Sequence, residues 1–389
     1  MPPLSRRVVL AGTAALGAAA LAPRAFAQET LKIGVLGTLT GPGAPWGLAI
    51  DGGARIAAKE VNDRGGLKIG DKYYAIEIVA YDDQYKAANA VTAVNRLIEV
   101  DGVRFILGPI ASASTLAIKS LTEKEKVLLF TASWSSAILK DADYVYRVGP
   151  TTQEFASATV AWVKANRPQV KRVATISAND ETGWNSQRVQ KEAYTKAGFE
   201  IVAAEHFERQ QTDFRPLVTK LLAANPDSIE LDTTPPATSG LIIRQAREQG
   251  YRGIFTKFGG FDVAEIVRTG GAENVEGVVG ILQADPESPE WARLKTAFAQ
   301  FHRNEMGDYT FLFYDAARLL FSALEKAGRT DADAVVAALA AQSPFPGTVG
   351  ELHWGGRETY GVAHQLYTPL FFLEIANGSG RVIGKAALS

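Results

Sequence analysis

The stretch RFILGPIASASTLAIKSL (Arg104–Leu121) runs from an apolar segment through Gly-Pro and several hydroxyl residues into a helical pattern. Its apolar start predicts a buried strand, and the spacing that follows predicts a helix. Similar strands, YAIEIVAY before it and VLLFTAS after it, alternate with helical patterns of ten or more residues. This alternation predicts βαβ units, and hence a parallel sheet covered by helices on both faces.

A second series of strands and helices begins after DYVYRVGPT (Asp143–Thr151), where Gly-Pro interrupts the rhythm. Two series predict an α/β protein with two doubly wound lobes, because the chain is too long for one comfortable core. We expect residues 28–149 and about 282–346 to form the first lobe, and residues 150–281 and about 347–389 to form the second. The chain would then cross between the lobes more than once, as a hinge of several segments.

The N-terminus has the pattern of an export signal. Arg6 and Arg7 precede an uncharged, weakly apolar run, and the small-x-small sequence AFA (Ala25–Ala27) supplies a cleavage site. Paired arginines are typical of twin-arginine export, and an ordinary basic Sec signal is the alternative. Both alternatives predict that residues 1–27 are removed by cleavage near Ala27 and that the protein reaches the periplasm.

The composition after the leader argues against several classes of partner and site. The leader carries three Arg and no acid, so 38 basic and 42 acidic side chains remain. That balance lacks the basic surplus that attracts nucleic acid or an anionic membrane. The chain has no Cys, which excludes disulfides, thiol nucleophiles and thiolate metal sites. Its four His lie in unrelated segments, so we expect no metal site and no cofactor.

Hydroxyl residues gather where two neighbouring strands end. Ser112 and Ser114 lie at the start of the helix after RFILG, where backbone N–H groups lack partners and the helix dipole favours an anion. Ser133 and Ser135 lie in the loop after the next strand. Because ligands of open α/β sheets bind at the carboxyl ends of the strands, these loops predict a socket for a carboxylate. The alternative is that the serines only cap their helices.

Aromatic side chains in the same set of loops are candidates for the walls of a ligand cleft. Three of the six Trp fall there: Trp46 in GPGAPWG, Trp134 in TASWSS and Trp184 in NDETGWNS. A Trp at the head of a connecting loop can present a rigid apolar surface to a ligand, or it can pack beneath its own loop. Tyr85, in DDQYKA, is a fourth candidate.

Five motifs follow one another along nearly the whole chain after the leader: IGVLGTLTGPGAPWG, AAKEVNDRGGL, VAYDDQYKAANAV, LGPIASAST and NDETGWNS. In this set and order they resemble the periplasmic solute-binding proteins of branched-chain amino acid ABC importers. The resemblance implies the type I periplasmic-binding fold, whose two lobes close on a ligand. It also implies an ABC permease of the inner membrane as partner, and a binding protein rather than an enzyme.

The resemblance also implies roles for individual residues. The carboxylate-binding serine of the family falls on Ser112, and the second loop pair falls on Ser133 and Ser135. The aromatic residue after the first strand falls on Trp46. In the second lobe, the position before the Gly of ETG is usually aromatic in amino-acid binders, and here it is Thr182.

One departure from the family pattern bears on the ligand. Amino-acid binders place an acidic side chain after the strand that corresponds to FTKF, where it holds the ligand's ammonium group. This chain has Gly259 and Gly260 there, with Asp262 slightly later. An ammonium group buried without a carboxylate is costly. Either an acid takes that role or the ligand is a small aromatic or other apolar carboxylate without an amine. The candidate acids are Asp262, Asp180, Glu181 and Asp232.

Two other functions remain open at this point. An exported two-domain α/β enzyme would need an acid, base or nucleophile in the cleft, and the loops offer carboxylates without a recognisable catalytic spacing. A ligand-sensing domain for a membrane receptor would share the fold and the site. We expect a monomer, since the sequence has no feature specific to an oligomer.

Overall fold

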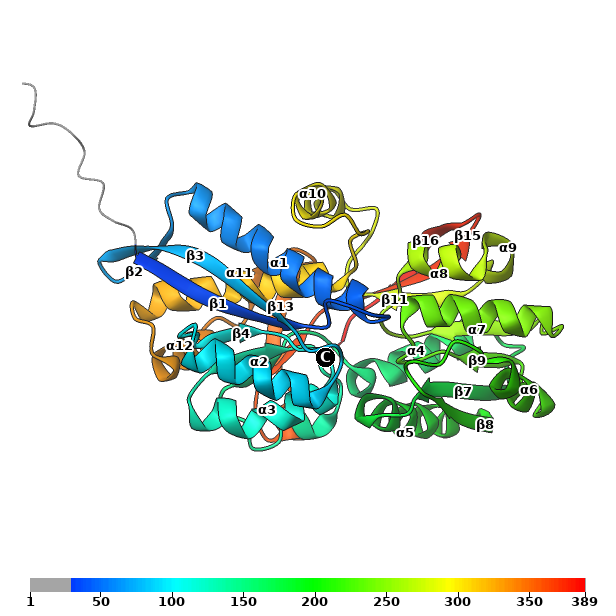
Figure 1. The fold of residues 1–389 in the computed structure, drawn as a ribbon. Coiled ribbons are helices and arrows are strands. Elements are labelled where there is room, and N and C mark those ends of the chain that lie inside the picture. The colour runs from blue at the N-terminus through cyan, green and yellow to red at the C-terminus, as the bar shows by residue number, and fades with distance from the viewer. Residues whose placement is uncertain (1–28, 389) are drawn as a thin grey trace, which may run out of the picture.

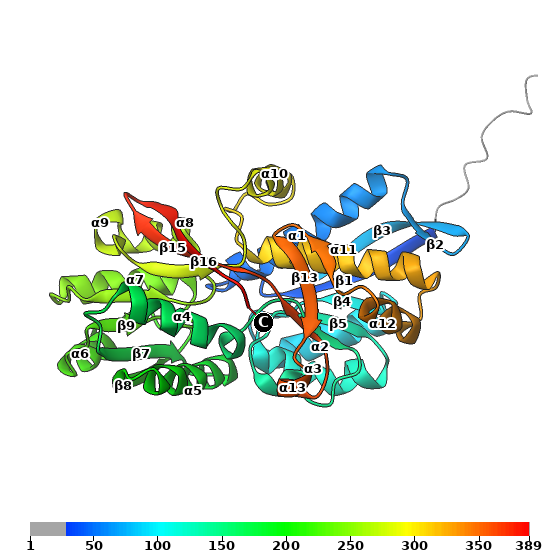
Figure 2. The ribbon, with the colours of Figure 1, turned by 180° about the vertical axis from the view of Figure 1, so that it is seen from behind.

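The structure is a computed structural model that describes residues 29–388. Its chain forms two α/β lobes that lie side by side, each built on one sheet with helices against it (Figure 1, Figure 2). The predicted fold class, two lobes with mainly parallel sheets, is confirmed. The predicted leader, residues 1–27 with cleavage near Ala27, lies outside the described residues.

The first lobe contains a nine-stranded sheet in the order β12-β13-β14-β6-β5-β4-β1-β3-β2. β1 lies between β3 and β4 and is parallel to both, which makes it the point where the strand order reverses. Short buried strands such as FIL and LLFT form the centre, as expected for a sheet covered on both faces. The strands are β1 (Glu29–Gly37), β2 (Leu67–Ile69), β3 (Lys72–Asp82), β4 (Phe105–Leu107), β5 (Leu128–Thr131), β6 (Val145–Arg147), β12 (Phe345–Gly347), β13 (Gly350–Gly355) and β14 (Gln365–Tyr367).

The second lobe contains a seven-stranded sheet in the order β16-β15-β11-β10-β9-β7-β8. β7 lies between β8 and β9 and is parallel to both, so it occupies the place that β1 has in the first lobe. The strands are β7 (Arg172–Ala178), β8 (Glu200–Phe207), β9 (Ser228–Glu230), β10 (Ile254–Lys257), β11 (Val279–Leu282), β15 (Leu370–Ala376) and β16 (Ser379–Ala386).

Helices connect the strands and cover the sheets. In the first lobe α1 packs on the long apolar helix α11, whose side chains belong to the largest buried cluster. In the second lobe α7 packs on α8. The helices of the first part of the chain are α1 (Ala44–Asp63), α2 (Ala87–Glu99), α3 (Ser112–Lys124), the 3-10 turn η1 (Ser136–Ile138), α4 (Thr152–Asn166), α5 (Glu181–Lys196) and α6 (Arg215–Ala223). Those that follow are α7 (Pro236–Glu248), α8 (Val263–Gly270), α9 (Ala272–Val275), α10 (Pro289–Phe298), α11 (Tyr309–Ala327), α12 (Ala332–Ala340) and α13 (Arg357–Tyr360).

The chain passes between the two sheets three times, after β6, after β11 and after β14. The last of these crossings comes later than predicted. The sequence predicts that residues from about 347 on belong to the second lobe, but β13 and β14 belong to the sheet of the first lobe. β13 pairs with β14, and β14 pairs with β6, so these strands extend the first sheet instead of entering the second lobe. Only β15 and β16 return to the second sheet.

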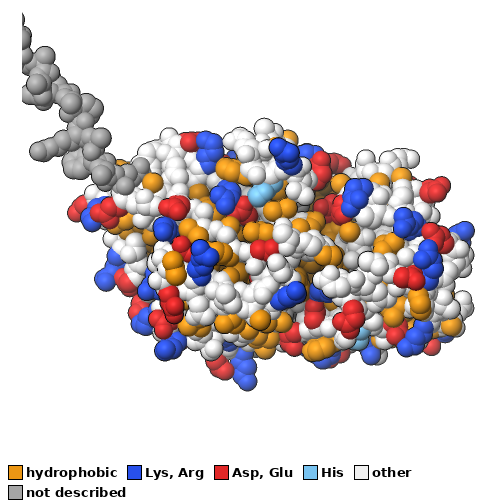
Figure 3. Space-filling model, viewed as in Figure 1, with side chains coloured by type: hydrophobic (Ala, Val, Ile, Leu, Met, Phe, Trp, Pro, Cys, Tyr) orange, Lys and Arg blue, Asp and Glu red, His pale blue; other side chains and the backbone are white. Residues whose placement is uncertain are grey.

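Two further features concern the distribution of surface charge and the apolar character of the helices. On the face shown in Figure 3, basic and acidic side chains are interspersed over both lobes. No helix in the described part of the chain combines the length and the apolar character of a membrane span.

Candidate ligand-binding site

The carboxyl ends of the strands at both reversal points face each other across the junction of the lobes. Nine residues from both lobes line a space of about 300 Å³, part of it open to solvent, which we call the inner cavity. They are Trp46, Tyr85, Ile110, Trp134, Thr182, Thr233, Gly259, Gly260 and Tyr309. Six of the nine follow strands β3, β4, β5, β9 and β10 directly or closely, which is where ligands of doubly wound sheets bind.

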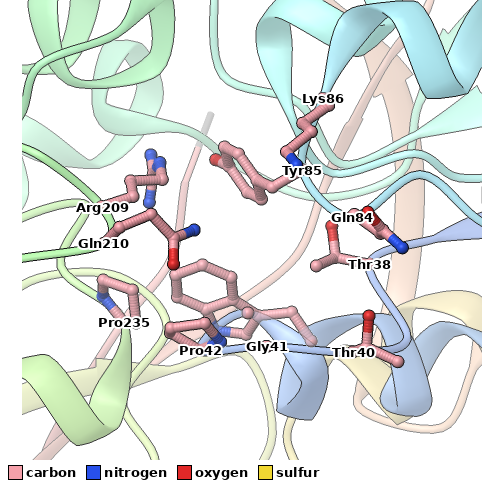
Figure 4. A pocket seen from close by; sticks show the side chains of 12 residues that line it. Thr38, Thr40, Gly41, Pro42, Gln84, Tyr85, Lys86, Arg209, Gln210 and Pro235 are labelled. Carbon is pink, nitrogen blue, oxygen red and sulfur yellow. The ribbon is translucent and has the colours of Figure 1, made fainter.

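A second and wider space adjoins it, and Trp46 and Tyr85 belong to the walls of both. This outer cavity measures about 700 Å³, including the part that is open to solvent. Figure 4 shows its two sides: Arg209, Gln210 and Pro235 come from the second lobe and face side chains of the first. The other lining residues are Thr38, Thr40, Gly41, Pro42, Gly43, Gln84 and Lys86.

Trp134 reaches from the first lobe into the second. It follows β5, yet its ring packs with its edge against Phe155 of α4, with 5.5 Å between the ring centroids. It belongs to a buried cluster that otherwise consists of second-lobe side chains such as Phe258. The sequence predicts that Trp134 lines the ligand cleft, and in the structure its side chain lines the inner cavity between the lobes.

Gly259 and Gly260 provide the surface against which two indoles lie. A Cβ on Gly259 would lie 2.0 Å from Cη2 of Trp134, and one on Gly260 would lie 3.0 Å from Nε1 of Trp46. Both glycines also have positive φ, +125° and +58°, a region that side chains disfavour. The acid that amino-acid binders carry in this loop has no room here, because the indoles fill that space.

The predicted serine socket is engaged in bonds within the protein. Oγ of Ser112 accepts hydrogen bonds from the backbone N–H groups of Trp134 and Ser135, each at 3.1 Å. Oγ of Ser133 lies 2.6 Å from Oγ1 of Thr115, and Ser133 is completely buried. These hydroxyls organise the loop after β5, and neither serine is among the residues that line the inner cavity.

The backbone N–H of Ser112 points to the second lobe. It donates to Oγ1 of Thr182 at 3.3 Å, and the hydroxyl of Tyr85 lies 3.4 Å from the same oxygen. Oγ of Ser135 donates to Glu181 across the junction at 2.8 Å and also caps η1, as the capping alternative predicted. The lobes are therefore closed on each other in this structure.

Arg209, in the loop after β8, was not identified from the sequence. Its guanidinium lies over the ring of Tyr85, 4.0 Å from the centroid, and burial raises the pKa of Tyr85 to about 12. The guanidinium forms an ion pair with Asp180 and donates from Nη1 to the carbonyl of Thr233 at 3.3 Å. Its Nη2 is buried without a hydrogen-bond partner.

Behind the glycine loop lies a buried charged group in the second lobe. Nζ of Lys257 donates to the carbonyl of Gly259 at 2.6 Å, and burial lowers the pKa of Lys257 to about 8. Glu230 accepts from the backbone N–H of Phe258 at 3.0 Å, and burial raises its pKa to about 7. This group holds the shape of the loop on which the indoles rest.

Two predicted ligand contacts lie elsewhere. Trp184 is 50% exposed on α5, and its Nε1 donates to Asn179 at 2.9 Å, so it does not wall the inner cavity. Asp262 caps α8 by accepting from the backbone N–H of Glu265 at 3.0 Å, and it lines a different cavity beside β15. Sequence spacing placed both near strand ends but did not show which way their side chains turn.

The other candidate acids are also engaged. Asp180 pairs with Arg209, Glu181 accepts from Ser135, and Asp232 is fully buried, accepting from Ser186 and from the backbone N–H of Thr233. No Asp or Glu is among the residues that line the inner or the outer cavity.

Two cavity residues that sequence reasoning missed had weak signals. Tyr309 begins α11, where it reads as one more apolar residue of a core helix. Arg209 stands in FERQQTDF, at the end of a strand, and a charged residue there could have been noted.

Comparison with known proteins agrees with the geometry. Residues 30–380 match the family model described as periplasmic binding protein. The chain is 28% identical over 340 residues to the leucine-, isoleucine-, valine-, threonine- and alanine-binding protein of Pseudomonas aeruginosa, covering 85% of this chain and 87% of that protein. It is 26% identical over 329 residues to the leucine-specific-binding protein of Salmonella typhimurium, with 82% and 84% covered.

Solved structures share the fold. A leucine-binding protein of Thermotoga maritima superimposes with a TM-score of 0.80 at 23% identity, covering 92% of this chain and 99% of that one. An ABC-transporter solute-binding protein of R. palustris in complex with benzoate has a TM-score of 0.78 at 19% identity, with 92% and 97% covered. The resemblance inferred from the five motifs is confirmed, and the chain belongs to the periplasmic binding protein family.

Proposed function

We propose that this protein is the substrate-binding component of an ABC importer, which captures a small apolar carboxylate between its lobes and delivers it to a permease. Relatives at 26–28% identity are named for binding branched-chain and other amino acids. Proteins of the same fold include complexes with isoleucine and with benzoate. A branched-chain or related amino acid and a small aromatic acid are therefore the two ligand classes to compare.

The observation that carries the choice between them is the polarity of the unpaired atoms in the cavity walls. Among the residues that line the two cavities, the buried side-chain atoms without a partner are Nε1 of Trp46 and Nη2 of Arg209. Both are donors, and buried donors need acceptors. With no carboxylate in either wall, the site matches an anion better than an ammonium group. We therefore favour a carboxylate that lacks an amine.

Each part of the site would have a distinct role in capture. Trp46, Tyr85, Trp134 and Tyr309 supply apolar and rigid walls. The backbone N–H of Ser112, which here donates to Thr182, would donate to the ligand carboxylate instead. Ser133 and Ser135 would hold the loop after β5.

Delivery depends on the position of the lobes. Ligand bound between them stabilises the closed form by its difference in affinity for the two forms, and the permease would recognise that form. With export directed by residues 1–27, capture would take place in the periplasm, and we propose that the protein acts as a monomer.

A thermal-shift screen tests this function. Protein produced from the full sequence is denatured and refolded to remove bound ligand, and then screened with leucine, phenylalanine, benzoate, cinnamate, short amides and urea. A ligand at 100 times its Kd adds about 2.7 kcal/mol of stability. A shift with at least one carboxylate supports the proposal. Shifts with amides alone, or chemical turnover of the bound probe, would refute it.

A further inference from the structure

Arg209 has hydrogen-bonding capacity that the protein itself does not use. Its guanidinium has three nitrogens, of which Nε meets Asp180 and Nη1 meets the carbonyl of Thr233. Nη2 has no partner although it is buried, and the side chain as a whole is 14% exposed. A guanidinium presents its donors in a fixed plane, so the free nitrogen cannot turn away to find another partner.

The position of Arg209 connects it with the ligand cavity. It lines the outer cavity and stacks on Tyr85, whose ring also lines the inner cavity and whose hydroxyl lies near Thr182. Tyr85 therefore lies beside both the Ser112–Thr182 contact and Arg209. Figure 4 shows Arg209 and Gln210 across the outer cavity from Lys86 and Tyr85.

The charge around the outer cavity favours an acceptor. Its walls contain two basic side chains, Arg209 and Lys86, and no acidic one. Asp180 pairs with the Nε edge of Arg209 and leaves Nη2 free. A ligand group that accepts a hydrogen bond from Nη2 would form a charge-assisted bond at low exposure, the strong class of hydrogen bond.

We propose that Arg209 determines specificity for solutes with a second acidic group, which it binds at the outer end of the site while the first carboxylate lies at the Ser112 end. This inference rests on the proposed function and names its substrate class, a small dicarboxylate with an apolar body. It assigns to the loop after β8 a role in ligand choice that the sequence motifs do not suggest.

Paired probes test the proposal by calorimetry on the full-length protein. Benzoate is paired with benzene-1,4-dicarboxylate, which adds one distal carboxylate. Leucine is paired with glutamate, in which a distal carboxylate takes the place of the two branched methyl groups. The variants are Arg209→Met, and Arg215→Met as a control that removes a nearby arginine with a 57% exposed side chain.

The wild-type protein should bind the diacid of at least one pair more tightly than its monoacid. Arg209→Met should weaken that diacid about 10- to 100-fold, the range of a hydrogen bond to a charged group. The monoacid should lose much less, since it reports only the lost stacking on Tyr85. Arg215→Met should change neither.

Other outcomes distinguish failure of the role proposed for Arg209 from failure of the proposed function. Equal losses for monoacid and diacid in Arg209→Met, or a wild-type preference for the monoacid in both pairs, would overturn the role of Arg209 and leave the carboxylate-binding function intact. Failure of the wild-type protein to bind any of the four probes, together with no thermal shift from any carboxylate of the screen, would refute the proposed function itself.

Discussion

Gly259→Ala should weaken ligand binding without a comparable effect on the fold. The added methyl carbon would lie 2.0 Å from Cη2 of Trp134, well inside van der Waals contact. Trp134 belongs to the first lobe and Gly259 to the second, so we expect this overlap to arise when the lobes close and to be relieved when they open. Overpacking of this kind costs about 1–3 kcal/mol, which corresponds to a loss of about 5- to 150-fold in affinity.

The positive φ of Gly259 adds a second cost that we expect in open and closed forms alike, about 1–3 kcal/mol for a residue with a Cβ. Gly198→Ala is the matched control, because Gly198 has φ +91° and no heavy atom within 4 Å of the added carbon. Urea denaturation of the ligand-free variants and calorimetry with a probe that binds the wild type separate the two costs. The free energy of unfolding should fall in both variants, and affinity should fall only in Gly259→Ala. An affinity loss below about threefold, or the same loss in both variants, would show that Trp134 does not rest on this loop in the bound form.

Three further substitutions test other contacts. Ser112→Ala should lower the free energy of unfolding by about 1–3 kcal/mol even without ligand, because the buried N–H groups of Trp134 and Ser135 lose their acceptor. Unchanged stability with a selective loss of carboxylate binding would instead show that the Ser112 hydroxyl contacts the ligand. Thr182→Val removes the acceptor of the Ser112 N–H, a bond worth about 0.5–1.5 kcal/mol. The ligand-free protein should therefore populate the open form more, although Ser135 still meets Glu181 across the junction, and its mean radius of gyration in X-ray scattering should rise. An unchanged radius would contradict the interlobe bond. Burial raises the pKa of Glu230 from its usual range to about 7. The stability that the protonated carboxyl contributes is therefore complete below pH 4.5 and is lost as the pH rises through about 7. Urea denaturation should show that Glu230→Gln loses less stability than the wild type over that interval, and parallel pH profiles of the two proteins would contradict the burial of Glu230.

The sequence was sufficient for the architecture because period and alternation are local properties. Strands and helices that alternate in two series imply two doubly wound lobes, and the reversal points at β1 and β7 then fix where ligands bind. The boundary near residue 346 failed for a long-range reason. Whether β13 and β14 join one sheet or the other depends on pairing with β6, more than 200 residues away, and no local pattern records that pairing.

The site was only partly predictable, because side-chain direction depends on tertiary packing. Trp46, Trp134, Tyr85 and Thr182 line the inner cavity as expected for loops at strand ends. Trp184 comes from the same kind of loop but turns to solvent. Hydroxyl-rich loops predicted a carboxylate socket, whereas the structure shows most of those hydroxyls bonded to the protein's own backbone and to one another.

The glycine pair illustrates a feature that sequence and structure explain together. The sequence has Gly259 and Gly260 where amino-acid binders carry an acid, which leaves open whether the ligand has an amine at all. The structure supplies the physical reason, since Trp46 and Trp134 occupy the space that a side chain would need. Within the two cavities no other carboxylate replaces it.

Calorimetric titration with matched pairs that differ only in the amine tests whether the site takes a carboxylate without an ammonium group. Phenylalanine would be compared with 3-phenylpropanoate, and leucine with 4-methylpentanoate, on ligand-stripped protein. We predict that the deaminated member of at least one pair binds as tightly as the amino acid or more tightly, because the cavity walls offer donors and no carboxylate. Binding of the amino acids alone, with no heat from either deaminated acid, would contradict the account and would mean that an acid such as Glu181 or Asp180 leaves its present partner to hold the ammonium group.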